Sequence, residues 1–322
     1  EIDLQFFPEG GSLISTLKNN VAFKAIDKQG LPIAIKGRLI DQSGATLAST
    51  ESYYKGMGQF KLSPAPDQEY FFQIDEPEGI DSIYKLPTAY NSGTIISVDS
   101  VDVSDVLSVL FQSTSDLQGQ KATFQLKKND QVIGEFGFGL KQQQIVQLPL
   151  EKLSIGVYTL KVVNEALTHQ SERLFFVKPR EQLNISIQTN KAAYKAREKV
   201  EGQLSVKDSK GNPIAGDFSI AAIYKTRSLI PNSEQPNLMA QILLKSDLRG
   251  HIPTPNFYFS QDEKAIQALN LVLLLDLADF ASFSTGFCKS FLLAFTMIYA
   301  CVMTQKIQFF LNFIANKIPI KF

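Results

Sequence analysis

Few residues in this 322-residue chain have the types and spacing that chemistry requires. His169 and His251 are the only histidines, so no multi-histidine metal site and no repeated proton relay can be built. His169 stands in a polar stretch, 168–170, which indicates a solvated loop histidine rather than a ligand. His251 follows Gly250, and we interpret it as a partner of a helix terminus. No Gly-x-Ser-x-Gly motif accompanies either histidine, so the sequence supports no Ser-His-Asp triad.

The densest acidic cluster consists of Asp99, Asp102 and Asp105, in the stretch SVDSVDVSD. Oxygen-rich loops of this kind can bind calcium. On a strand, however, this spacing distributes the three carboxylates over both faces, so protection of a loop and an edge strand is the preferred interpretation. The stretch 137–139, Gly-Phe-Gly, is too short for a phosphate loop and indicates ordinary sheet glycines. We therefore predict no catalytic residue, no metal site and no cofactor, and the chain is predicted not to be an enzyme.

The bulk composition excludes several classes of partner. Lysine plus arginine equals aspartate plus glutamate, 32 of each, so no overall field attracts nucleic acid or an acidic membrane. Cys288 and Cys301 are the only cysteines, which excludes a disulfide framework and a thiolate metal site from residues 1–280. The chain begins at Glu1 without a leader, which is expected of a mature protein or of a fragment, and we prefer the interpretation as a fragment.

A repeated stretch organises the rest of the chain. Val21–Ala34 recurs in degenerate form as Val200–Ala215, and in both an alternating run leads into Asp-x-x-Gly-x-Pro-Ile-Ala. Alternation places every second side chain on a buried face, Asp caps the turn, Gly supplies a positive φ, and Pro begins the return strand. Both copies are predicted to be β-hairpins, and two copies predict a repeated β-module.

Short alternating runs separated by turn signals predict β-sandwiches rather than βαβ units. We predict a first sandwich over residues 1–89 and a second over 90–179. A third module, 181–230, begins at 183–187 and supplies only strands through 218–224, too few to close a sandwich unaided. The expected strands of the first module are 4–8, 20–26, 33–40, 46–52, 59–62 and 69–74. Those of the second are 94–98, 106–112, 122–127, 132–138, 144–148, 157–163 and 174–177.

A helical insertion is predicted over residues 231–280. Residues 237–245 have apolar side chains at helical spacing, although Ile-Leu-Leu is also compatible with a strand. Ser260 and Glu263 match a capping box, which predicts a helix from there to about Leu275.

The apolar tail, 281–322, contains no acidic residue and both cysteines. Its segment 290–303 is nearly all apolar, and a transmembrane helix there would take Lys289 into one end of the span. The alternative, which we prefer because the composition changes abruptly, is the product of a shifted reading frame. A membrane is therefore a partner only if the 290–303 segment is genuine.

Two adjacent aromatic pairs, Tyr53-Tyr54 and Phe71-Phe72, are candidates for a binding surface. In a sandwich each pair is expected to split between core and solvent. The exposed rings could bind a peptide, a glycan or a neighbouring domain, and packing between domains is the preferred use.

Several of these motifs resemble a known family. Residues 3–11, 21–25 and 56–60 resemble the macroglobulin-like β-domains of large cell-envelope proteins of Bacteroidota. Residues 194–200 with 208–215 resemble the second macroglobulin domain (MG2) of the alpha-2-macroglobulin superfamily, and 244–250 with 255–259 resemble the segment that follows it. The resemblance covers about residues 1–275. It implies an all-β chain of tandem Ig-like or macroglobulin-like sandwiches, located outside the cytoplasm, in the periplasm or at the outer membrane or cell surface.

The resemblance also implies a function. It favours a non-enzymatic structural or binding segment, truncated from a larger outer-membrane-associated or TonB-linked protein, whose partners are other domains or subunits. The family's Gly-Trp-Arg stretch is missing here, and the chain contains no Trp, which supports a truncated, out-of-frame end. The alternative is an endopeptidase-inhibitor module, for which 225–236, with Lys225 and Arg227, is the candidate bait loop. Cys288 lacks the Gln acceptor that a macroglobulin thioester requires.

Overall fold

The computed structural model describes residues 2–80, 82–98, 106–164, 171–179, 183–194, 198–217 and 236–275. The chain forms two compact units, of which the first comprises Glu1–Lys178 with Leu229–Ser282 and the second Pro179–Ser228 with Phe283–Phe322. The strands pair antiparallel throughout the described sheets, so the predicted all-β fold of tandem sandwiches is confirmed.

The first sandwich consists of two sheets that enclose one apolar core. One sheet has the order β1-β2-β5 and the other β4-β3-β6-β7. The strands are β1 (Asp3–Pro8), β2 (Asn19–Ile26), β3 (Lys36–Asp41), β4 (Thr46–Glu51), β5 (Met57–Leu62), β6 (Tyr70–Glu76) and β7 (Ile83–Lys85). Alternate residues Val21, Phe23 and Ala25 of β2 face this core together with Phe60 and Phe72.

The second sandwich has the sheets β12-β9-β8 and β11-β10-β13-β14. Its strands are β8 (Thr94–Val98), β9 (Val106–Ser113), β10 (Lys121–Lys128), β11 (Gln131–Gly139), β12 (Gln143–Pro149), β13 (Gly156–Val163) and β14 (Ser171–Val177), with the short 3-10 helix η1 (Ser115–Leu117) after β9. Every strand predicted for this module overlaps an observed one.

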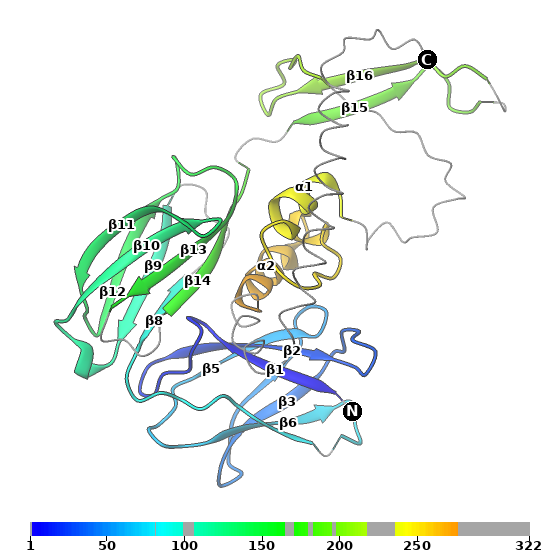
Figure 1. Ribbon diagram of the computed structural model, residues 1–322. Coiled ribbons are helices and arrows are strands. Elements are labelled where there is room, and N and C mark those ends of the chain that lie inside the picture. The colour runs from blue at the N-terminus through cyan, green and yellow to red at the C-terminus, as the bar shows by residue number, and fades with distance from the viewer. Residues whose placement is uncertain are drawn as a thin grey trace, which may run out of the picture. The chain divides into compact units, whose positions relative to one another are not determined.

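The two sandwiches share one topology. In each, the first, second and fifth strands form one sheet, and the fourth, third, sixth and seventh form the other, in that order. Two consecutive sandwiches of one topology form a repeated β-module (Figure 1). The turn motif that predicted a repeat lies elsewhere, in the first sandwich and in the second unit, and does not occur in the second sandwich.

The Asp-x-x-Gly turns form as predicted. Asp27 Oδ1 accepts hydrogen bonds from the backbone N–H of Gln29 at 2.9 Å and of Leu31 at 2.8 Å, and Gly30 has a φ of 79°. Asp208 makes the equivalent bonds to the backbone of residues 210 and 212. Asp41 heads a third turn of the same construction.

The hairpin prediction is wrong beyond the turn. Pro32 forms only an isolated bridge with Ile26, and the Ile33 N–H donates to the Ala25 carbonyl at 3.1 Å. The chain then crosses to the opposite sheet, where β3 pairs with β4 and β6 and not with β2. In the other copy Pro213 bridges Lys207 in the same way. The turn depends on local residues and could be predicted from the sequence. The sheet that the segment after the turn joins depends on distant strands and could not.

These turns predict that the stability of the fold depends on pH. The Ser43 hydroxyl, and then the backbone N–H groups of the turn, hold the pKa of Asp41 below its ordinary value, and the Asn212 side chain does the same for Asp208. A carboxyl whose pKa is lower in the folded state stabilises the fold above its unfolded pKa, and this stabilisation is lost as the pH falls through the folded pKa. We expect NMR pH titrations to give both carboxyls a pKa below the ordinary value of aspartate, and Ser43→Ala to raise the pKa of Asp41 only. An ordinary midpoint for Asp41 in the unmodified chain would contradict this account.

The helical segment, 236–275, belongs to the first unit. It contains α1 (Leu238–Ala240), the π-helical turn η3 (Gln241–Lys245), the 3-10 turn η4 (Phe257–Phe259) and α2 (Glu263–Leu275). Residues 238–245 are therefore helical and not a strand. The predicted capping residue is wrong: Asp262, not Ser260, caps α2, because its Oδ1 accepts from the Lys264 N–H at 2.8 Å. Ser260 instead follows the end of η4.

Helix α2 is buried between the two sandwiches of the first unit. It contacts β14 of the second sandwich and β1, β2 and β5 of the first (Figure 1). Its residues Leu271–Leu274 are buried all around the helix, because sheets lie on more than one side of it. The outer face of the β1-β2-β5 sheet is also apolar. Its residues Phe7, Ala22 and Met57 belong to the same apolar cluster as the core of the second sandwich.

The described part of the second unit is a single hairpin. Strand β15 (Asn184–Thr189) pairs with β16 (Gly202–Lys207), and both lie in the stretch predicted as the third module. Three predicted segments lie outside the described residues: the strand 218–224, the bait loop except Pro236, and the tail 281–322. Within the ranges that the structure describes, no helix is long and apolar enough to span a membrane.

Candidate functional site

The structure places only part of the predicted candidate residues. Asp99, Asp102, Asp105 and His169 lie outside the described residues. The Gly-Phe-Gly stretch 137–139 lies in β11, as the strand interpretation predicted. In the described ranges, no group of three or more His, Cys, Asp or Glu residues could hold a metal ion.

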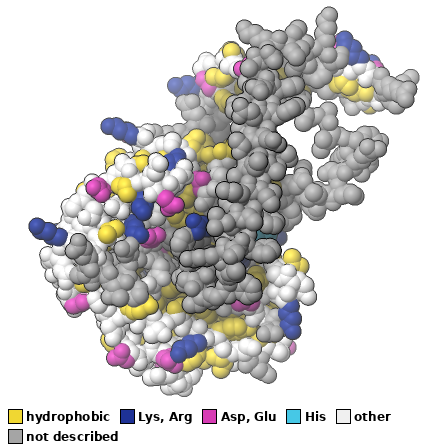
Figure 2. Space-filling view, viewed as in Figure 1, with side chains coloured by type: hydrophobic (Ala, Val, Ile, Leu, Met, Phe, Trp, Pro, Cys, Tyr) yellow, Lys and Arg dark blue, Asp and Glu magenta, His cyan; other side chains and the backbone are white. Residues whose placement is uncertain are grey.

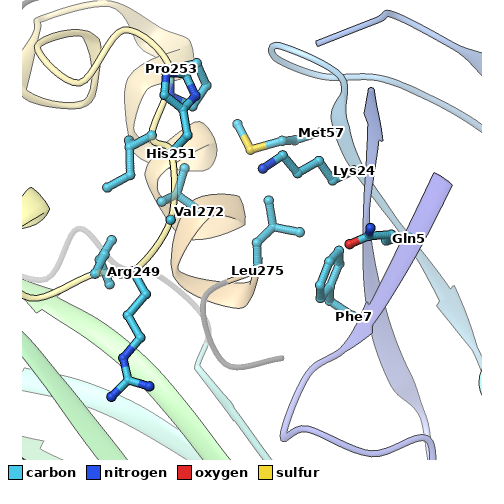
Figure 3. Close-up of a pocket in the computed structure, with 12 residues that line it drawn as sticks. Gln5, Phe7, Lys24, Met57, Arg249, His251, Pro253, Val272 and Leu275 are labelled. Carbon is cyan, nitrogen blue, oxygen red and sulfur yellow. The ribbon is translucent and has the colours of Figure 1, made fainter. Parts of the chain in front are cut away.

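His251 lines a small cavity at the seam between the first sandwich and the helical segment. Figure 3 shows Lys24 and Met57 from the sandwich, His251 from the loop before η4, and Val272 and Leu275 from α2 around this space. The cavity measures about 60 Å³, whereas pockets for small ligands usually measure at least about 300 Å³. This cavity is a small gap between the first sandwich and the helical segment. It can hold a few water molecules but not a substrate.

The most specific cluster of polar side chains is a buried joint, formed by Glu9, Asn20, Arg173 and Asn270. The Nε of Arg173 donates to Glu9 Oε1 at 2.6 Å, and the two side chains are 0% and 5% exposed. Arg173 also donates through Nη1 to the Leu174 carbonyl at 2.7 Å and through Nη2 to Asn270 Oδ1. Glu9 Oε2 accepts from Asn20 Nδ2 at 3.4 Å. The guanidinium thus binds three acceptors and the carboxylate is shared, so neither buried charge lacks a partner.

The joint connects three parts of the chain. Glu9 follows β1 in the first sandwich, Arg173 lies in β14 of the second, and Asn270 lies in α2. A buried ion pair adds little net stability over an apolar replacement, but breaking it leaves an uncompensated charge. The joint therefore links the first sandwich, the second sandwich and α2 through one set of buried partners.

Gly10 permits the close approach at this joint. It bridges Glu172, whose N–H donates to the Gly10 carbonyl at 3.2 Å. Its φ is 89°, and an added Cβ would lie 2.6 Å from the Ser171 hydroxyl oxygen, which accepts a hydrogen bond from the Ile96 N–H. Both the backbone angle and the space require glycine here.

An aromatic contact adds a second connection. Tyr54 stacks on Phe257 of η4, with ring centroids 4.1 Å apart and planes 9° apart, and its hydroxyl is 2.7 Å from the Thr254 hydroxyl. Phe72 is buried while Phe71 is partly exposed, so this pair splits as predicted. Tyr53 and Tyr54 do not split: both are half-buried, because a tight turn before β5 places them and not a strand. Tyr54 thus contacts the helical segment.

Each sandwich also carries a tyrosine at the start of its sixth strand. Tyr158 is the third residue of β13, and its hydroxyl donates to the Ser154 carbonyl at 2.9 Å. Tyr70 begins β6, and its hydroxyl oxygen accepts from the Ala65 N–H at 2.8 Å. In both sandwiches the phenol fixes the corner that precedes this strand.

Sequence reasoning missed all four residues of the joint, Glu9, Asn20, Arg173 and Asn270, and it also missed Tyr70. One sequence feature could have indicated the joint: a polar residue inside an apolar run. Arg173 lies in SERLFFV, and Asn270 lies in ALNLVLLL. Arg173 shares its strand face with Phe175 and Val177, and this parity already indicated a buried guanidinium.

Comparisons with known proteins identify no family. No protein-family model matches the chain, and no curated protein matches it either. Among solved structures, the chain is similar to the three N-terminal domains of the highly immunogenic outer capsid protein (Hoc) of bacteriophage RB49. The identity is 12%, the match covers 67% of this chain and 70% of that chain, and the TM-score is 0.21. At this TM-score the similarity defines neither the fold nor the function of this chain.

Proposed function

We propose that this chain is a non-enzymatic structural and binding segment of a cell-envelope protein, in which two β-sandwiches are held as one rigid unit. The single observation that carries the proposal is the buried joint. One buried ion pair, with the hydrogen bond from Arg173 to Asn270, connects three elements that are far apart in sequence. Removing two charges from water costs free energy, so we infer that the pair is retained because it fixes the relative position of the sandwiches. Domains in one chain otherwise move relative to each other by default.

The finer assignment to Ig-like or macroglobulin-like modules has two supports. The shared strand order, with three strands facing four, is compatible with Ig-type sandwiches, and the tyrosines at the start of β6 and β13 resemble the tyrosine corner of that fold. The motifs at 3–11 and 208–215 add the resemblance to envelope macroglobulin domains. Together they favour a periplasmic or surface location, with other domains or subunits of an envelope protein as partners.

Fractionation of cells that produce the chain tests the location. We expect an antibody against the chain to detect it in the envelope or periplasmic fraction, beside an established periplasmic marker. Recovery with a cytosolic marker would contradict the proposal.

A protease assay separates the alternative, an endopeptidase inhibitor. We expect trypsin to hydrolyse a protein substrate at an unchanged rate in the presence of excess chain. A stoichiometric loss of activity that disappears in a Lys225→Gln/Arg227→Gln variant would support the inhibitor class instead.

A further inference from the structure

Strand β11 is an exposed, largely apolar sheet edge. Among the strands that the structure describes, it pairs with β10 alone and forms the end of its sheet. Its residues 131–137 are all exposed, including Val132, Ile133 at 50% and Phe136 at 39%. Figure 2 shows hydrophobic side chains at the surface over this sandwich. Natural proteins usually protect such an edge with charges, proline, bulges or a covering segment, and β11 carries one charge, Glu135, and one bulge, at Ile133.

The first sandwich provides an internal comparison, because β4 and β5 occupy the positions of β11 and β12. There the Thr50 hydroxyl donates to the Gln59 carbonyl at 2.9 Å and joins the two edge strands. The backbones also approach closely, since a Cβ on Gly58 would lie 2.7 Å from the Glu51 carbonyl oxygen. In the second sandwich, no hydrogen bond joins β11 to β12 among the described residues. The same topology is therefore closed at this side in the first copy and open in the second.

A polar side chain at this open side lacks a partner. Gln144 of β12 lies opposite Phe111, and its amide nitrogen is buried without a hydrogen bond to the described chain. Phe111 in turn contacts Phe138 of β11, with ring centroids 5.3 Å apart. A buried amide donor without an acceptor is unfavourable, and an acceptor from a segment added at this side would remove that cost.

Charge defines the segment that fits. Glu135 is the only charged residue in β11, and β12 has none. Glu135 pairs with Gln125 on the outer face, whereas Phe136 and Phe138 pair with the buried residues Phe124 and Ala122. A complementary strand therefore carries apolar side chains on its inner face and one basic side chain on its outer face.

We propose that the β11 edge binds an extended segment of a partner protein by strand addition, with alternating apolar residues and a basic residue opposite Glu135. Backbone hydrogen bonds to the edge supply affinity and the alternate side chains supply specificity. This proposal deepens the binding part of the proposed function and does not depend on the rigidity of the joint, so the two can fail separately.

The test uses the full chain and a fluorescent nine-residue peptide of alternating Thr and Val with a central Arg on the Thr face. We expect saturable binding by anisotropy, together with new protection from hydrogen exchange in 131–139. The same peptide with alternate backbone nitrogens methylated is the control, and it is expected not to bind. Absence of binding, or equal protection of 46–51 in β4, would overturn the proposal. Concentration-dependent protection of 131–139 without peptide would also overturn it, because the occupant would then be a second copy.

Matched variants test the edge and its charge. Ile133→Lys is expected to weaken binding at least about tenfold, whereas Leu47→Lys, at a 48% exposed position of β4, is expected to leave it unchanged. Glu135→Lys should reverse the preference, so that a peptide with a central Glu binds better than the Arg peptide. Because these positions are exposed, thermal unfolding is expected to show that all three variants fold. Equal affinity of the Arg peptide for Glu135→Lys and the unmodified chain would contradict the charge assignment.

Gln144→Leu gives an independent readout. Removing the unpaired donor should leave the thermal midpoint unchanged or higher, while peptide affinity falls about fivefold to tenfold. A lower midpoint with unchanged affinity would show that Gln144 has a structural role only and would contradict its part in the proposal.

Discussion

Replacing Arg173 by Met is expected to lower the free energy of unfolding of the first unit by about 3–5 kcal/mol. Met approximates the length of the side chain but removes all three donor nitrogens, so Glu9 and Asn270 keep their buried oxygens without the guanidinium. The measurement is urea denaturation of the full chain, followed by circular dichroism and by tyrosine fluorescence, because the chain has no Trp.

The matched control is Arg38→Met. Arg38 pairs with Asp75 at 2.9 Å, but both side chains are about 40% exposed, and such surface pairs contribute at most about 1 kcal/mol. The double variant Glu9→Gln/Arg173→Met should recover part of the lost stability, because it leaves no unpaired buried charge. Equal losses for Arg173→Met and Arg38→Met would contradict the role of the joint.

Leu273→Ala is expected to cost about 2–5 kcal/mol, the range for removal of a fully buried leucine side chain. Leu273 lies in the part of α2 that is buried on all sides, in contact with strands of both sandwiches. The same urea measurement gives the loss, and hydrogen exchange is expected to rise both in α2 and in β14, which it contacts.

Leu238→Ala, in α1, makes the same chemical change at a residue that is 73% exposed. It is expected to change the free energy of unfolding by about 0.5 kcal/mol or less. If Leu273→Ala were as mild as Leu238→Ala, the helical segment would not be an integral part of the first unit.

The sequence predicted what depends on local chemistry. Strand positions followed from alternation, and the turns at Asp27 and Asp208 followed from the carboxylate acceptor and the glycine at its fixed offset. The α2 helix was also predicted, although its cap was misplaced by two residues, because Ser260 and Asp262 are both good capping types and only the start of the helix decides between them.

The sequence did not predict what depends on distant partners. The residues after Ile33 join β3 in the opposite sheet, and that choice is made by β6, more than 30 residues later. The joint pairs residues 164 and 97 positions apart, Glu9 with Arg173 and Arg173 with Asn270. Single polar residues in apolar runs indicate that a buried partner exists, but periodicity does not identify the partner.

The helical segment shows the same limit at a larger scale. It follows the third module in sequence and was expected as an insertion there, yet its described residues pack within the first unit. Its apolar residues Leu269, Leu271 and Val272 predicted burial, and the contacts with β1, β2, β5 and β14 show where that burial occurs. The outer face of β1-β2-β5 gave the matching signal, since Phe7 and Met57 are apolar residues on a face that a lone sandwich would expose.

A distance measurement between the two sandwiches tests the central claim, that they form one rigid unit. In the full chain with Cys288→Ser and Cys301→Ser, spin labels are attached at Thr46→Cys in β4 and Gln143→Cys in β12, both exposed positions. Pulsed electron paramagnetic resonance is then expected to give a single narrow distance distribution, which Arg173→Met broadens. A broad distribution in the chain with an intact Arg173 would contradict the claim, because the joint would then not hold the sandwiches in one arrangement.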